Sequence, residues 1–157
     1  MSTLLLALAL TAAPALGSGL DPARADRSMT CSVDVHALDE TGGRFSARRV
    51  SAALAPAVVF RGKLGDRDPE APAPTLLFDV FGPRGQRYQV LVAEPRVVVS
   101  ERDGHRVRRV SKAREASLAV AGSSIAWTSM YGKWRVEPRI EGEAKPCGRP
   151  EYFTIRP

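Results

Sequence analysis

The densest group of side chains that could bind a ligand is a basic run, HRVRRVSKAR, from His105 to Arg114. Guanidinium groups hold phosphate, sulfate and carboxylate groups through bidentate hydrogen bonds, and clustered positive charge steers anions toward a surface. In an extended chain, Arg106 and Arg108 would share one face of the strand, and Val107 and Arg109 the other. The candidate anion-binding residues are Arg106, Arg108, Arg109, Lys112 and Arg114.

This basic run has two interpretations. As a binding site, it would hold lipid head groups, lipopolysaccharide or acidic glycans. As a solvated hairpin, its arginines would only deter the edge-to-edge aggregation of strands. Nucleic acid is not expected as a partner, because no aromatic residues interleave with the arginines for base stacking. Trp127 and Tyr131 are separate candidates for an aromatic contact with carbohydrate, whereas Trp134 follows the alternation of a core position.

The sequence predicts no catalytic residue, metal site or cofactor. Its two histidines, His36 and His105, are expected at the surface, and no nucleophile-elbow motif accompanies its serines. Carboxylate pairs such as Asp66 and Asp68 lie in polar segments and are expected to be solvated. The acidic stretch GDRDPE lacks the spacing of a calcium loop, and no cluster of His and Cys has the spacing of a zinc site.

The N-terminus predicts export. Residues 4–16, LLLALALTAAPAL, form an uncharged apolar run that is shorter than the about 20 residues of a membrane span. We therefore expect a signal peptide over residues 1–17, with cleavage after Ala15, Gly17 or Ala25, and a flexible mature N-terminus over residues 18–30. No transmembrane segment is expected in the mature chain. The predicted location is periplasmic, surface-associated or secreted.

Composition and cysteine content agree with export. Cys31 and Cys147 flank the remaining chain, and an even pair in an oxidising compartment predicts a disulfide that ties its ends together. The alternative is two buried free thiols. Lys and Arg number 23 against 17 Asp and Glu, a net charge of +6. Usage rich in Arg, Ala and Pro, without any Asn, favours a GC-rich bacterial genome.

The elements that position these residues are predicted to be strands. Residues 31–157 show period-2 alternation in short segments separated by turn residues, which predicts a single all-β domain, an antiparallel sandwich of eight or nine strands. Residues 45–54 fit either a strand or a helical turn. The predicted strands cover residues 31–36, 58–60, 76–81, 88–92, 96–100, 116–120, 134–140 and 153–155, with the chain turning at Gly122 to Ser124 into Ile125 and Trp127.

Three further motifs resemble small secreted bacterial immunoglobulin-like and macroglobulin-like domains. These are the Pro-x-Gly turn in Phe81-Gly82-Pro83-Arg84-Gly85, the strand Gly132-Lys133-Trp134-Arg135-Val136, and the closing Phe153-Thr154-Ile155 after the turn at Glu141-Gly142. The resemblance spans Thr75 to Ile155 and implies a sandwich that binds or scaffolds. Cys147 departs from the antibody pattern, because it lies in the loop after the Trp134 strand.

Together these features favour a non-enzymatic binding or structural module of the bacterial envelope or exterior. It would be an accessory subunit of a surface or periplasmic assembly with a protein partner. The first alternative is an anionic-ligand domain that uses the segment from Arg106 to Arg114. The second is a small hydrolase or hydrolase inhibitor, and the enzyme would need His36 or His105 within hydrogen-bond reach of a serine or carboxylate.

Overall fold

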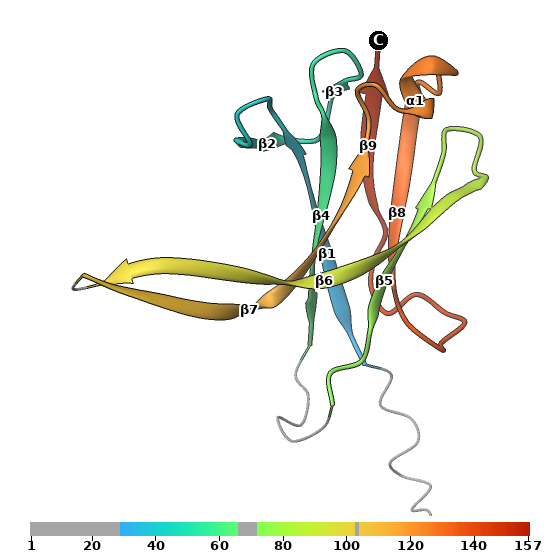
Figure 1. The fold of residues 1–157 in the computed structure, drawn as a ribbon. Helices are drawn as coiled ribbons and strands as arrows, with labels where there is room; N and C mark the ends of the chain where they lie inside the picture. The colour runs from blue at the N-terminus through green and yellow to red at the C-terminus, as the bar shows by residue number, and fades with distance from the viewer. Residues whose placement is uncertain (1–28, 66–71, 103) are drawn as a thin grey trace, which may run out of the picture.

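The structure is a computed structural model that describes residues 29–65, 72–102 and 104–157. The described chain is almost entirely β, with one short helix (Figure 1). Its elements are β1 (Cys31–Leu38), β2 (Arg44–Ser46), β3 (Val50–Ser51), β4 (Ala57–Leu64), β5 (Leu76–Phe81), β6 (Arg87–Arg102), β7 (His105–Ala119), α1 (Ser124–Trp127), β8 (Gly132–Ile140) and β9 (Glu151–Arg156). The predicted all-β class and strand number are confirmed.

Hydrogen bonding links the nine strands in the order β2-β1-β4-β7-β6-β5-β8-β9-β3. Strands that are far apart in that order contribute side chains to one core. The continuous sheet therefore folds over on itself into a sandwich-like arrangement. The pairing is antiparallel except between β3 and β9, which are parallel. The sequence predicted antiparallel pairing only. The parallel pair is possible because β3 and β9 lie far apart along the chain and no hairpin turn joins them.

The core is built on four aromatic rings. Phe60 of β4 lies 5.8 Å from Phe78 of β5 and 5.7 Å from Phe153 of β9, measured between ring centroids. Trp134 of β8 is fully buried, stacks on Phe153, and donates a hydrogen bond from Nε1 to the carbonyl oxygen of Met130 at 3.1 Å. This bond satisfies the polar atom of the largest core side chain. The predicted alternation of β8, with Trp134 facing inward, is confirmed.

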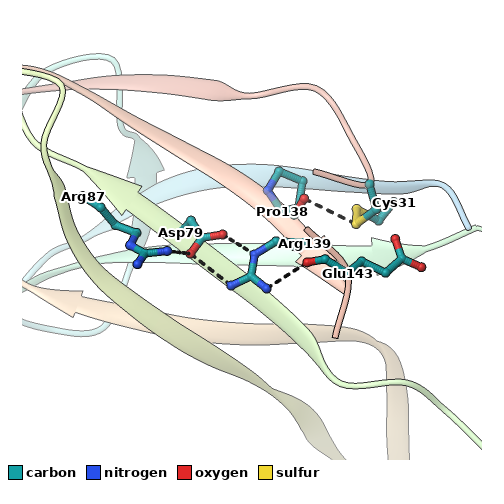
Figure 2. Close-up of polar contacts among 7 residues, drawn as sticks. Cys31, Asp79, Arg87, Pro138, Arg139 and Glu143 are labelled. Carbon is teal, nitrogen blue, oxygen red and sulfur yellow. Dashed lines mark hydrogen bonds and ion pairs between the residues drawn. A yellow bond between two sulfur atoms is a disulfide. The ribbon is translucent and has the colours of Figure 1, made fainter. Parts of the chain in front are cut away.

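The loop between β8 and β9 is fastened to the body at two points (Figure 2). The predicted disulfide joins Cys31 to Cys147, and the Cys31 amide donates to the Cys147 carbonyl at 3.0 Å. Nearby, Arg139 of β8 donates from Nε to the buried carboxylate of Asp79 at 2.6 Å and from Nη1 to the Glu143 carbonyl at 3.2 Å. The hydrogen bond to Asp79 raises the pKa of Arg139.

Three local expectations are corrected. The two strands expected over residues 88–92 and 96–100 are one strand, β6, of 16 residues, and the charged stretch after the turn at Gly104 is part of β7. Residues 124–127 form the helical turn α1, which begins where the Ser123 hydroxyl accepts a hydrogen bond from the Ile125 amide. The ambiguous residues 45–54 contribute two short strands, β2 and β3, rather than one element.

Several predictions lie outside the described residues. The expected signal peptide, its three cleavage points and most of the N-terminal segment fall within residues 1–28. The carboxylates Asp66 and Asp68 of the acidic stretch fall within residues 66–71.

Candidate binding surface

The long hairpin of β6 and β7 extends away from the sandwich as a two-stranded ribbon (Figure 1). β6 pairs with β5 only as far as Ala93, and β7 pairs with β4 only from Arg114 onward. Beyond those points the two strands pair only with each other. At the usual rise per residue, this part of β6 extends about 30 Å. We call Glu94–Arg102 and His105–Ala113 the distal ribbon.

The sequence favours this ribbon locally. Three consecutive β-branched residues, Val97, Val98 and Val99, prefer extended backbone. Gly104 at the turn has a φ of 73°, which a residue without a side chain adopts at little cost. Local preference therefore favours the hairpin, whose distal part lies outside the hydrophobic core and whose base is anchored to β4 and β5.

Positive charge is concentrated on the ribbon. The distal ribbon contains six of the 23 Lys and Arg residues and two of the 17 Asp and Glu residues. It therefore carries a net charge of +4, two thirds of the +6 of the whole chain. A projecting, basic element produces a field that attracts anions before contact is made.

Both faces of the distal ribbon combine arginine with valine. On one face, Val97 lies opposite Val110 and Val99 lies opposite Arg108. On the other face, Val98 lies opposite Arg109 and Ser100 lies opposite Val107. Val110 is 69% exposed and Val99 58%, so these apolar side chains are in solvent. On either face of the ribbon, the valines can form apolar contacts with a partner and the arginines can hold anionic groups.

At the base of the ribbon, one carboxylate collects the surrounding positive charge. Glu115 of β7 forms ion pairs with Arg44, Arg61 and Arg96, at 2.8, 3.8 and 3.5 Å. Burial acts to raise the pKa of Glu115, but the hydrogen bond from Arg44 and the three positive charges outweigh it, so the pKa is lowered. The base of the ribbon is thus fixed to β2 and β4 by ion pairs.

The structure places the predicted anion-binding residues unevenly. Arg106, Arg108, Arg109 and Lys112 are exposed on the distal ribbon, whereas Arg114 is half-buried where β7 joins the sheet. The register of the two strands shifts between Pro95 and Val97, which separates Arg114 from the others. Sequence reasoning missed the valines of β6 as parts of the same surface. The β-branched run within residues 96–100 predicted a strand but gave no sign that its side chains would be outside the core.

The histidines do not form a catalytic arrangement within the described residues. His36 lies opposite Ser46 on neighbouring strands, in a shallow hollow of about 280 Å³ that also contains Asp34 and Glu151. No hydrogen bond joins His36 to a serine or carboxylate there, and the Ser46 hydroxyl accepts one from the Arg48 amide at 3.4 Å. His105 is exposed beside the ribbon turn. No group of three or more described His, Cys, Asp or Glu residues has the arrangement of a metal site.

The two aromatic candidates differ in their accessibility. Trp127 is 81% exposed on α1 and donates from Nε1 to the Gly122 carbonyl at 3.2 Å. Tyr131 is half-buried against the core, and its hydroxyl donates to the Ala126 carbonyl at 3.3 Å. Of the two, only Trp127 is mostly exposed to solvent, and it lies on α1 rather than on the ribbon. The two therefore do not form a shared platform.

Two further observations bear on function. Across the described residues, no helix has both the length and the apolar character needed to span a membrane. The disulfide is compatible with an exported protein. No family model matches the chain, and neither a curated protein nor a solved structure matches it.

Proposed function

We propose that this protein is a non-enzymatic binding domain of the bacterial envelope or exterior, and that the distal ribbon is its contact element. The single observation that supports this most strongly is the location of charge. Six basic residues and exposed valines occupy a distal ribbon that adds little to the core. Exposed apolar side chains cost solubility unless a partner covers them. The ribbon is therefore best explained as a surface that binds an anionic partner, such as another subunit of an envelope assembly.

Site-directed cross-linking tests this proposal. A photo-reactive residue replaces Val110 on the ribbon, and the same residue at the exposed Ala53 of the body serves as the matched control. In the native host, we expect a specific cross-linked product from position 110 and none from position 53. The product should disappear when Arg108→Glu and Arg109→Glu are introduced together. Equal cross-linking from both positions, or a product that survives charge reversal, would contradict the proposal.

An alternative uses the same ribbon to bind lipid head groups, lipopolysaccharide or acidic glycans directly. The net charge of +4 on the ribbon supports this alternative as well. Vesicles of phosphatidylglycerol, and separately purified lipopolysaccharide, distinguish it from a protein partner. Binding to either that weakens with salt and is lost on charge reversal would favour the alternative, because exposed charges are screened within about 10 Å at 0.1 M salt.

The hydrolase alternative depends on the hollow around His36. The opposed Ser46 and His36 are not hydrogen-bonded, so a general base does not activate the serine in this arrangement. The inhibitor version lacks a specific structural feature in its support. We therefore favour binding over catalysis.

A further inference from the structure

We propose that the distal ribbon takes up an additional β-strand, supplied by an acidic extended segment of the partner protein, along the open edge of β6 at residues 97–100. This inference rests on the proposed function, and it specifies how the ribbon and its partner are joined. Strand addition uses main-chain hydrogen bonds for affinity and alternate side-chain contacts for specificity.

The backbone of the distal ribbon provides the edge. A strand in an antiparallel ladder directs its N–H and C=O groups alternately toward its two sides. Because distal β6 pairs only with β7 among the described residues, half of its backbone groups point toward an open edge. A row of such groups is a template for another strand.

The two edges of the ribbon differ in how well they are protected. Along β7, charged side chains at Arg106, Arg108 and Arg109 deter pairing with an unselected strand. Along β6, residues 97–100 are Val, Val, Val and Ser, with no charge among them. The β6 edge is therefore the one that favours strand addition.

Charge and side-chain placement together select the occupant. A second copy of this chain would bring another ribbon with a net charge of +4 against the first, which disfavours self-pairing at moderate salt. A flat bilayer would cover only one face of the ribbon and leave valines exposed on the other, because both faces carry them. An added strand lies in the plane of the ribbon, so its alternate side chains contact Val98 on one face and Val97 and Val99 on the other. Acidic residues in it would be attracted by Arg108 and Arg109.

The experiment uses a short peptide of alternating glutamate and valine as the probe and a lysine–valine peptide as its control. Hydrogen exchange of the free protein first identifies which of Val98 and Val99 directs its N–H to the open edge. Proline at that position removes one main-chain donor without changing the charge or the pairing with β7. We expect this variant to bind the acidic peptide at least about fivefold more weakly than the wild type does, which corresponds to the loss of one hydrogen bond.

A second measurement avoids any effect of proline on folding. In the wild type, adding the acidic peptide should slow exchange at alternate amides of residues 97–101 and leave the intervening, already paired amides unchanged. The lysine–valine peptide should produce no protection. Arg108→Glu with Arg109→Glu should weaken binding of the acidic peptide by about tenfold or more.

Three outcomes would overturn strand addition. The first is that the open-edge proline variant binds the acidic peptide as tightly as the wild type does. If charge reversal still abolishes binding in that case, the proposed function stands and only strand addition fails. The second is a dimer of the free wild type that the proline variant loses, which would make a second copy the occupant. The third is that the wild type and the proline variant bind phosphatidylglycerol vesicles equally and neither binds the acidic peptide. If the wild type bound no partner through the ribbon, the proposed function itself would be contradicted.

Discussion

Arginine has opposite roles in the body of this protein and in its distal ribbon. Around Glu115 and Asp79, guanidinium groups are neutralised by carboxylates and join neighbouring strands. On the distal ribbon, Arg106, Arg108 and Arg109 are exposed beside valines. The same residue type thus stabilises the fold where it is paired with a carboxylate of the body, and is exposed to a partner on the distal ribbon. The comparison predicts that stability and binding can be altered separately.

The largest expected effect on stability is the loss of the disulfide from the body. The bond joins residues 116 positions apart, and replacing both Cys31 and Cys147 by alanine should lower the free energy of unfolding by about 2–5 kcal/mol. Urea denaturation measures this change, with reduced wild type as the control. Under conditions in which the variant remains folded, its ribbon should bind as the wild type does. A loss of binding in the folded variant would show that body and ribbon are coupled.

A smaller effect is expected at the base of the ribbon. Glu115→Gln should lower the free energy of unfolding at neutral pH by about 1–2 kcal/mol, because three arginines lose their shared carboxylate. Since the pKa of Glu115 is lowered on folding from 4.5, the wild type should lose this stabilisation as the pH falls below 4.5 and through the lower folded-state value. Denaturation of the wild type and Glu115→Gln across that pH range should therefore show a decreasing difference between their free energies of unfolding.

The exposed Glu141 provides the matched control for this measurement. Glu141→Gln removes the same charge from the loop after β8 and should change stability little at any pH. If it matched Glu115→Gln, net charge rather than the ion-pair cluster would explain the result.

The smallest effect on stability is expected from the variant with the largest effect on binding. Arg108→Glu with Arg109→Glu should change the free energy of unfolding by less than about 0.5 kcal/mol, because these exposed side chains lie away from the core. Urea denaturation would check this value, and the cross-linking assay would follow the loss of binding in the same protein. A destabilisation of several kcal/mol would instead assign the distal arginines to the fold.

Much of the body could be predicted from sequence, because burial imposes a visible pattern. Trp134, Val136 and Ile140 alternate with charged residues in β8, and this alternation identified their core positions directly. The Cys31–Cys147 bridge was predicted from the number and position of the cysteines together with the expected export. In both cases local sequence and tertiary structure demand the same arrangement.

The ribbon and the chain connections were harder to predict, because they depend on where each strand ends relative to its neighbours in the sheet. The run Val97–Val99 looks the same in a strand of the sandwich as in one that has left it. Asp79 gave no sign that Arg139, 60 residues away, would neutralise it. The parallel pairing of β3 with β9 likewise depends on the path of the whole chain. Of the candidate site, sequence identified the arginines but neither the valines beside them nor the open edge.

The short connection between β2 and β3 has a consequence for how the protein behaves in concentrated salt. Four residue steps separate Ser46 from Val50, so the two ends of the strand order lie within about 14 Å of each other. Both end strands are also very short, which limits the template they offer. The two end strands themselves therefore offer little open edge, and charge repulsion protects the ribbon only while ionic strength is moderate. High salt removes that repulsion, so precipitation during salting-out should begin with ribbons from different molecules pairing along β6.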